Sequence, residues 1–394
     1  MTARRSRVAA VIALSCGAAS ALLGACASDE EPGFVEPPPG VVAPGGDAGP
    51  GDAEAGACTT DDCEFFPSMC TPDVLCLNGP FDPVSPTAGM NWQVRIQAIN
   101  GRSPSDIWVA GAAGAVAHYD GTSWKTSDVG TQESLRAVWP LDSGEVTFGL
   151  VEHIYARGFG AAGDGGVTPD GWSLRAKSLP SGFNGGRFVT AAWGTPASEA
   201  LWFAAGETLW RLRVTPSSEL EILPGAPPSA CPVSPCRQIR SIHGASAGTI
   251  WAVGDLGAVV RITNADGDAP IATQLHAPTW TGLAGVWAAS NTDVWAVGGT
   301  GTILRYTGDP LRGDVVPDVP TNANLNAVWG TSSTDVWAVG NAGVVVHFDG
   351  TRWSRVKIAG LGDRRPDLGA VWSPGPGQVW IGGRGVLLAL GGKP

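Results

Sequence analysis

The chain has 394 residues, 43% of them hydrophobic, which excludes a wholly disordered protein and allows one large domain or two ordinary ones. Its 56 glycines and 31 prolines, with only 15% charged residues, favour many short strands joined by tight turns over helices. The formal net charge of −11 argues against a nucleic-acid partner, because such proteins need lysine and arginine to neutralise phosphates.

Residues 1–25 have the layout of an export signal peptide. Three arginines precede an apolar run over 8–23, which is too short and too interrupted to span a bilayer. The run ends in the letters LGAC at 23–26, which resemble the bacterial lipobox. This resemblance implies cleavage before Cys26 and acyl chains on that cysteine, which would anchor the protein in a membrane. An ordinary alanine-rich signal followed by a chance cysteine is the alternative.

Ala27 follows the lipobox cysteine, at a position where an aspartate implies retention at the inner membrane of Gram-negative bacteria. The resemblance therefore implies an outer-membrane lipoprotein that faces the periplasm or the exterior. Residues 26–57 are rich in Pro, Gly, Ala, Asp and Glu, and they cannot bury enough apolar surface to offset the entropy of ordering. We expect them to form a disordered acidic tether.

The cysteines are grouped as in exported proteins. Segment 58–88 carries one cluster, and the letters CPVSPC at 231–236 carry another pair. In an oxidising compartment this grouping predicts two disulfides in segment 58–88 and one that closes a local loop. A zinc site is the alternative, but the cluster has no Cys-x2-Cys pair and no nearby histidine, so we expect no metal. The cysteines expected in disulfides are Cys58, Cys63, Cys70, Cys76, Cys231 and Cys236.

Residues 89–394 repeat one phrase, whose fullest copy begins with the letters LNAVWGTSSTDVWAVG at 325–340. Seven copies can be aligned, roughly 40 to 55 residues apart, which is the length of a four-stranded propeller blade. Thr147 replaces the second tryptophan of the phrase in one copy. In the other copies that residue is Trp108, Trp202, Trp251, Trp295, Trp337 and Trp380.

The copies predict an all-β fold, a seven-bladed β-propeller of four-stranded blades. Apolar runs such as 336–339 suit strands buried on both faces, and glycine-containing links such as 341–343 suit turns with positive φ. The last copy stops at Leu390 without an outer strand, while Trp92 matches Trp353 of a complete copy. We therefore predict that an N-terminal strand at 91–95 pairs into the last blade and closes the ring.

The repeated residues are expected to be structural. A buried tryptophan removes roughly 150 to 250 Å² from water, so the repeated tryptophans are first of all packing residues. Asp106, Asp293 and Asp335 precede the second strand of their copies, where a carboxylate can accept hydrogen bonds from N–H groups of a turn. Catalysis needs a unique arrangement of groups, so a repeated acid does not indicate an active site.

In the lettering of this sequence, DVWAVG-x-x-G and DG-x-x-W resemble repeats of a broad bacterial propeller group. That group includes photosystem II assembly-factor-like proteins and neuraminidase-type Asp-box repeat proteins. The resemblance implies a propeller fold over most of 89–394, but the group contains assembly factors, lectins, glycosidases and lyases. In the Asp-box one residue separates Asp from Gly, whereas Asp120-Gly121 and Asp349-Gly350 are adjacent, which weighs against a sialidase.

Other motifs have simpler interpretations. The letters GFGAAG at 158–163 match a dinucleotide fingerprint, but no helical pattern follows, so we expect an insertion loop in the second blade. His118 and His347 share one repeat position with Arg261 and Arg305, which indicates a structural role at a strand end.

The expected recognition surface is the face that carries the connections between blades, and the loop closed by Cys231 and Cys236 is its best candidate. Arg364 and Arg365 on that face are expected to be a solvated pair, with binding of an acidic group as the alternative. The connections are expected at 173–188, 215–238, 307–324 and 354–367.

We therefore expect a monomeric, non-catalytic lipoprotein of the cell envelope whose propeller binds an envelope or extracellular protein. A carbohydrate-binding propeller is the alternative, and a hydrolase or lyase acting on polysaccharide is a third hypothesis, because propeller sites gather residues from distant blades. Membrane contact is expected through the lipid anchor alone. No catalytic residue, metal or cofactor is predicted.

Overall fold

The structure is a computed structural model, and it describes residues 67, 69–81, 89–160, 166–176, 179–180, 183, 186–205, 208–226, 238–308 and 311–392. The expected signal peptide at 1–25 and tether at 26–57 lie outside these ranges. So do five of the cysteines with a predicted role, namely Cys26, Cys58, Cys63, Cys231 and Cys236.

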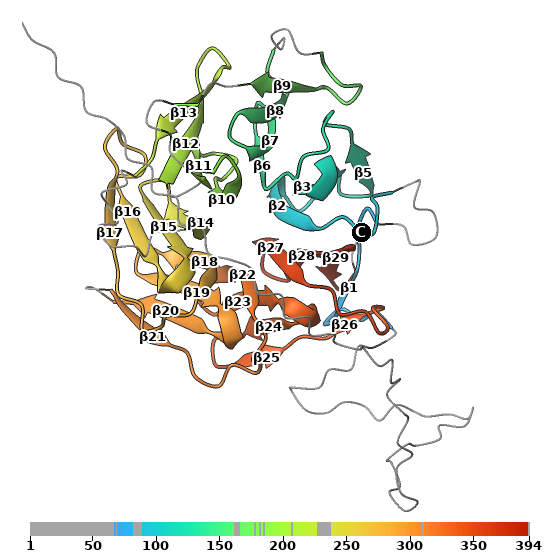
Figure 1. Cartoon of the computed structure of the whole chain (residues 1–394). Helices are drawn as coiled ribbons and strands as arrows, with labels where there is room; N and C mark the ends of the chain where they lie inside the picture. The colour runs from blue at the N-terminus through green and yellow to red at the C-terminus, as the bar shows by residue number, and fades with distance from the viewer. Residues whose placement is uncertain are drawn as a thin grey trace, which may run out of the picture. The chain divides into compact units, whose positions relative to one another are not determined.

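The described residues form seven sheets arranged round a common axis, and their strands are antiparallel except for one pair in the last sheet (Figure 1). Each sheet is one blade, and its strands lie side by side in chain order from the axis outward, apart from the last blade, which is described below. First strands of successive blades contact one another round the ring, and the ring closes where the first blade meets the seventh. The predicted seven-bladed propeller is confirmed.

The first strands are β2 (Ile96–Ser103), β6 (Ala137–Leu141), β10 (Val189–Trp193), β14 (Ile239–Ser246), β18 (Leu283–Ser290), β22 (Leu325–Ser332) and β27 (Leu368–Gly375). The second strands are β3 (Asp106–Gly111), β7 (Gly144–Leu150), β11 (Ala200–Ala205), β15 (Thr249–Gly254), β19 (Asp293–Gly298), β23 (Asp335–Gly340) and β28 (Gln378–Gly383). The third strands are β4 (Val116–Tyr119), β8 (His153–Arg157), β12 (Thr208–Val214), β16 (Val259–Thr263), β20 (Ile303–Thr307), β24 (Val345–Phe348) and β29 (Val386–Leu390). The fourth strands of the first six blades are β5 (Trp124–Ser127), β9 (Trp172–Ala176), β13 (Leu220–Pro224), β17 (Ile271–Gln274), β21 (Arg312–Val315) and β25 (Trp353–Arg355).

The outer strand of the seventh blade differs from the prediction. It is β1 (Leu75–Leu77), which pairs antiparallel with β29 and parallel with β26 (Ile358–Ala359). The segment 91–95 supplies only an isolated bridge between Arg95 and Arg384. Trp92 is 58% exposed, so it does not take the packed position of Trp353. The disulfide between Cys70 and Cys76 spans the start of β1, so this part of segment 58–88 belongs to the sheet.

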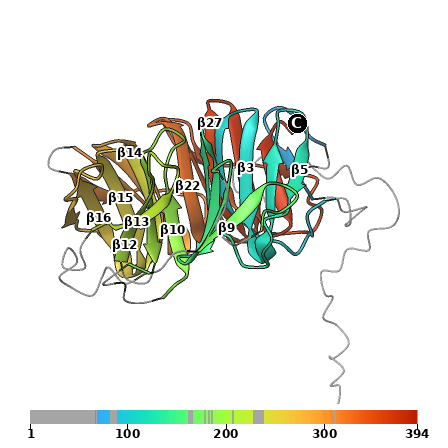
Figure 2. The same cartoon turned by 90° about the horizontal axis from the view of Figure 1, so that it is seen from above.

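The two faces of the ring carry different links, as the edge-on view shows (Figure 2). Links from second to third strands and connections to the next blade share one face, here called the turn face. Four of its links are three-residue 3-10 turns: Ala112–Gly114, Asp255–Gly257, Gly299–Gly301 and Asn341–Gly343. In the last of them Ala342 and Gly343 have φ values of 55° and 72°, so the predicted positive φ is confirmed.

These turns also hold the connection that follows. The N–H of Gly343 donates to the carbonyl of Pro366 at 2.8 Å. A Cβ at the equivalent Gly301 would lie 2.0 Å from the carbonyl oxygen of Thr321, so only glycine fits. The connections are shorter than predicted, because the expected ranges contain strand residues of β9, β13, β21, β25 and β26.

A ring of inner side chains locks the blades together. Four tryptophans pack over a glycine of the next blade: a Cβ would meet their rings at 2.6 to 2.8 Å at Gly101, Gly244 and Gly330 and at 3.3 Å at Gly194. The tryptophans are Trp372, Trp193, Trp287 and Trp139 respectively. Trp329 instead donates from Nε1 to the carbonyl of Ser373 at 3.2 Å. Blade contacts therefore depend on a large ring facing a residue without a side chain.

Two junctions lack this tryptophan. At the corresponding position of the first blade, Asn100 donates from Nδ2 to the carbonyl of Val138, in the second blade, at 3.2 Å. In the fourth blade, Nδ1 of His243 accepts a hydrogen bond from the N–H of Ala288, in the fifth blade, at 3.1 Å. Polar groups at these two positions thus bind the backbone of the next blade instead of packing on a glycine.

Candidate functional site

The first strands of all seven blades surround a cavity of about 660 Å³ on the propeller axis, here called the axial cavity. A β-bulge interrupts the pairing of first and second strands near the turn face in six blades. Bulges re-aim a side chain, and here each turns one residue toward the rim of the axial cavity. The bulge residues are Gln97, Thr190, Arg240, Ala284, Asn326 and Gly369.

Arg136 occupies the equivalent place in the second blade, where its backbone N–H donates to the carbonyl of Phe148 at 3.0 Å. Arg95 reaches the rim from the residue before β2, and its Nη2 lies 3.6 Å from where a Cβ of Gly369 would be. We call the six bulge residues, Arg136 and Arg95 the cavity mouth. Three arginines from the first, second and fourth blades therefore meet at one end of the axis.

The arginines at the cavity mouth differ in their partners. Arg240 forms an ion pair with Asp255, with Nε and Nη2 at 2.9 and 3.1 Å from the two carboxylate oxygens. Partial burial, and then the positive charges of Arg95 and Arg240, hold the pKa of Arg136 below its usual value. No aspartate or glutamate lines the axial cavity in the described part of the chain. The site is thus positive although the chain as a whole is acidic.

His243 lines the axial cavity further in and is only 7% exposed. Burial lowers the pKa of its imidazole to about 3, so the ring is neutral at pH 7. Because Nδ1 accepts the hydrogen bond from Ala288, the hydrogen of the neutral ring is on Nε2. Trp329 and Trp193 flank the ring, with centroids 4.9 and 5.4 Å away. His243 therefore offers a hydrogen-bond donor in an aromatic environment.

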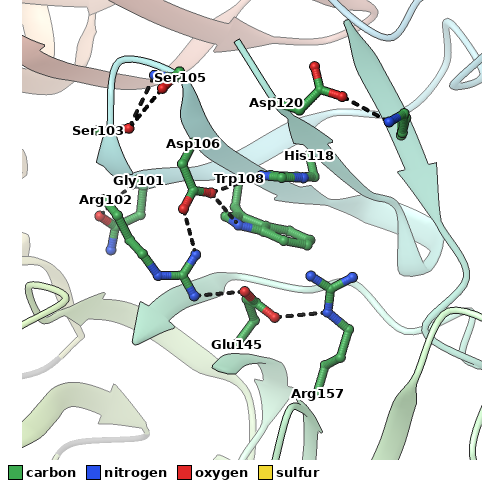
Figure 3. A network of polar contacts seen from close by, with 12 residues as sticks. Gly101, Arg102, Ser103, Ser105, Asp106, Trp108, His118, Asp120, Glu145 and Arg157 are labelled. Carbon is green, nitrogen blue, oxygen red and sulfur yellow. Dashed lines mark hydrogen bonds and ion pairs between the residues drawn. The ribbon is translucent and has the colours of Figure 1, made fainter. Parts of the chain in front are cut away.

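A second polar cluster lies between the first and second blades (Figure 3). Arg102 binds Asp106 through Nη1 at 2.8 Å and Glu145 through Nη2 at 2.7 Å. Arg157 binds the other oxygen of Glu145 at 2.8 Å, and its guanidinium lies 4.6 Å from the ring of Trp108. This cluster joins the blades at the junction where Asn100 replaces the inner tryptophan.

The carboxylates of this cluster are poor candidates for acid–base chemistry. Burial raises the pKa of Asp106, but hydrogen bonds from Arg102 and His118 outweigh it and hold the pKa below its usual value. Both oxygens of Glu145 are bound to arginines. A general base needs a pKa near the working pH and access to substrate, so the cluster is structural.

The three acids singled out from the repeat bind side chains rather than the N–H groups of a turn. Asp106 accepts from His118 at 2.8 Å, Asp335 accepts from His347 at 2.7 Å, and Asp293 pairs with Arg305 at 2.9 Å. The partner comes from the third strand, which confirms that His118, His347 and Arg305 share one repeat position. The turns are held by serine hydroxyls, as where Ser103 Oγ accepts from the N–H of Ser105.

The six repeated tryptophans are buried at second-strand positions, Trp108, Trp202, Trp251, Trp295, Trp337 and Trp380. Arg364 and Arg365 donate to backbone carbonyls, of Gly385 and Gly362 among others. The predicted loop with Cys231 and Cys236 lies outside the described residues. The letters GFGAAG begin directly after β8, in a link between strands, and the structure describes them as far as Gly160.

Sequence reasoning missed Arg95, Arg136, Arg240 and His243. The available signal was the second and fifth residues of each copy of the repeat, where Arg136, Arg240 and His243 depart from the other copies.

Within the described ranges, no group of three or more His, Cys, Asp or Glu side chains is placed to hold a metal ion. No helix of those ranges is long and apolar enough to cross a membrane.

No protein-family model matches the chain, and no curated protein matches it. Solved structures match at the level of the fold. The structure of YCF48 bound to D1 peptide is 13% identical with a TM-score of 0.56, over 82% of this chain and 96% of that one. The chain has the fold of a β-propeller.

Two further propellers are similar to this chain. The virginiamycin B lyase from Staphylococcus aureus is 14% identical with a TM-score of 0.54, over 76% of this chain and 95% of that one. The WD40 domain of Neurospora crassa Pan2 is 13% identical with a TM-score of 0.55, over 82% and 97%. At these identities the likeness shows the fold alone. A propeller fold is also what the resemblance of the repeats to photosystem II assembly-factor-like proteins implies.

Proposed function

We propose that this chain is a non-catalytic protein-binding module that recognises an envelope or extracellular protein through the turn face. The observation that carries the proposal is the axial cavity, whose cavity mouth on that face has three arginines and, among the described residues, no lining carboxylate. A structural neighbour, YCF48, is described as bound to a peptide, which supports a binding role for a propeller of this kind.

The state of the acidic groups favours binding over catalysis. Most hydrolases acting on polysaccharide use a pair of carboxylates at the reacting bond. In this propeller, Asp106, Glu145, Asp293 and Asp335 are each held by arginine, histidine or tryptophan side chains. The axial cavity itself is lined by arginines, amides, hydroxyl groups, the His243 imidazole and apolar groups.

The binding test uses the full-length protein with a C-terminal tag, incubated with envelope extract of the producing bacterium and then cross-linked. We expect cross-links to a captured protein to map to the turn face. Cross-links confined to the opposite face, or to the fourth strands, would contradict the proposed recognition surface. An unrelated acidic lipoprotein carrying the same tag is the matched control.

We also propose that the protein is a bacterial lipoprotein of the outer membrane, held by acyl chains on Cys26. The apolar run before LGAC and the absence of aspartate at Ala27 support this placement. Mass spectrometry of the N-terminal peptide is expected to show a lipidated Cys26, and Cys26→Ala is expected to move the protein out of the outer-membrane fraction. An unmodified Cys26 in the native protein would refute the anchor.

A carbohydrate-binding propeller is the second candidate. It is favoured by Trp280, which is 86% exposed in the connection between the fourth and fifth blades and offers an open indole face. Glycan-array binding that disappears in Trp280→Ala would support this function. The repeated tryptophans do not contribute to it, because they are buried.

A further inference from the structure

The cavity mouth concentrates positive charge that is only partly neutralised. Arg240 has Asp255 as its partner, but no hydrogen bond or ion pair of the described residues involves the guanidinium of Arg95 or of Arg136. Like charges held together are unfavourable, and a cleft with low-dielectric walls focuses their field on an incoming ligand. An anion bound at this point would relieve that repulsion.

A second, independent observation lies deeper in the axial cavity. His243 is more than nine-tenths buried and neutral, and its Nε2–H has no partner among the described residues. Nε2 is not one of the buried side-chain atoms left without a partner, so this donor is open to the axial cavity and accessible to an acceptor that enters it. A backbone carbonyl or carboxylate oxygen would satisfy it.

The size and lining of the axial cavity restrict the ligand. Its volume of about 660 Å³ is that of a typical ligand site, and it is large enough for a short stretch of chain. Nucleic acid does not fit, because a long polyanion would be repelled by a chain of net charge −11 and needs many more cations than three. The walls also include apolar side chains such as Ile99, Val286 and Val328.

We propose that the axial cavity receives an extended acidic segment of the partner protein, with a carboxylate bound by Arg95 and Arg136 and an acceptor oxygen deeper in the cavity bound by Nε2 of His243. This inference rests on the proposed function, and it names the part of the partner that is recognised. Arginine presents a planar fork that matches a carboxylate with two parallel hydrogen bonds. Arg240 adds long-range attraction while remaining paired with Asp255.

The test uses full-length protein and a fluorescein-labelled hexaglutamate peptide, with binding measured by fluorescence anisotropy. Hexaglutamate is expected to bind, hexaglutamine at least ten-fold more weakly, and added salt to weaken the binding of hexaglutamate. Equal affinity for hexaglutamate and hexaglutamine would overturn the proposal. Inorganic phosphate that displaces hexaglutamate at equal concentration would overturn the peptide as ligand, because the site would then be a simple anion site.

Variants locate the binding. Arg136→Gln is expected to weaken hexaglutamate binding about ten-fold, since a hydrogen-bonded charge pair is lost, and Arg136→Lys should restore part of it. Gln97→Glu adds a negative charge to the cavity mouth with little change of shape, and it should weaken binding as well. The matched control is Arg312→Gln, which removes an exposed charge from β21. An equal loss in Arg312→Gln and Arg136→Gln would show non-specific attraction and overturn the proposal.

The experiment separates this inference from the proposed function. A captured envelope protein that binds Arg136→Gln as tightly as the unchanged chain would refute the acidic segment and leave protein binding in place. If no envelope protein is captured while hexaglutamate binds through Arg136, protein binding is refuted as the function, and the cavity is an anion-binding peptide site without that partner.

Discussion

His347 donates a hydrogen bond of 2.7 Å from Nε2 to Oδ1 of Asp335, and its ring stacks on Trp337 with centroids 4.1 Å apart. Trp337 donates from Nε1 to the same oxygen at 2.9 Å. In the first blade, His118 and Asp106 form the same pair at 2.8 Å. A unit that recurs in the first and sixth blades with the same geometry stabilises the join between second and third strands, so its carboxylates are structural.

This unit predicts a pH-dependent loss of stability in Asp335→Asn. Burial raises the pKa of Asp335, but hydrogen bonds from Thr331, His347 and Trp337 outweigh it, so the pKa in the folded protein lies below its usual value. The carboxylate therefore stabilises the fold above pH ~4, and this contribution is lost as pH falls. We expect Asp335→Asn to lower the free energy of unfolding by about 1 to 3 kcal/mol at pH 7 and by less at pH ~3. Urea unfolding at both pH values measures this, with the exposed Asp314→Asn as control; equal losses at the two pH values would contradict it.

The closing strand predicts that Leu75→Ala is far more damaging than Leu77→Ala. Leu75 is fully buried between Leu390 and Ile358, whereas Leu77 of the same strand is 45% exposed. Truncation of a buried leucine costs about 2 to 5 kcal/mol, and truncation of an exposed one costs little. Thermal unfolding of the two variants measures the difference. If Trp92→Ala were the more destabilising change, the ring would be closed by 91–95 instead.

The packing of Trp287 on the next blade predicts a cost for Gly330→Ala. A Cβ at Gly330 would lie 2.7 Å from both the Trp287 ring and the carbonyl of Asp335, so one of them must move. We expect a loss of about 1 to 3 kcal/mol in the free energy of unfolding. Gly375→Ala is the matched control, because it also lies on a first strand and a Cβ there meets nothing within 4 Å. Similar unfolding midpoints for the two variants would refute blade locking by this ring.

Blade number and turn positions could be predicted because they depend on residues close together in the chain. The link at Asn341–Gly343 needs positive φ whatever surrounds it, and the spacing of Trp295 from Trp337 reflects one blade. The closing strand could not be predicted in this way. Its three residues at Leu75–Leu77 match no strand of the repeat, and the similarity of Trp92 to Trp353 gave the wrong segment.

The cavity mouth was missed for a different physical reason. Each of Arg95, Arg136 and Arg240 has the pattern of an ordinary exposed cation at a strand start. They meet only because a seven-membered ring brings the first strands of the first, second and fourth blades to one axis, where a bulge turns Arg240 toward the rim. Likewise, the hydrogen bonds of Asp106 come from the third strand, so turn chemistry alone gave the wrong donors.

His243 gives a prediction about stability at moderately acid pH. Its pKa is lowered to about 3 in the folded protein by burial, whereas an unfolded histidine titrates near 6.5. The unfolded chain therefore binds a proton that the folded chain excludes, and stability is lost as pH falls from ~6.5 toward ~3. In His243→Asn the side-chain oxygen can still accept the hydrogen bond from Ala288, but the side chain does not titrate. Between pH ~7.5 and ~4.5 the free energy of unfolding of this variant should therefore fall by about 2 to 3 kcal/mol less than that of the unchanged chain. Urea unfolding at the two pH values checks this against the exposed His276→Asn, which should behave like the unchanged chain. An equal pH dependence in His243→Asn and the unchanged chain would mean that the imidazole accepts its proton within the folded axial cavity.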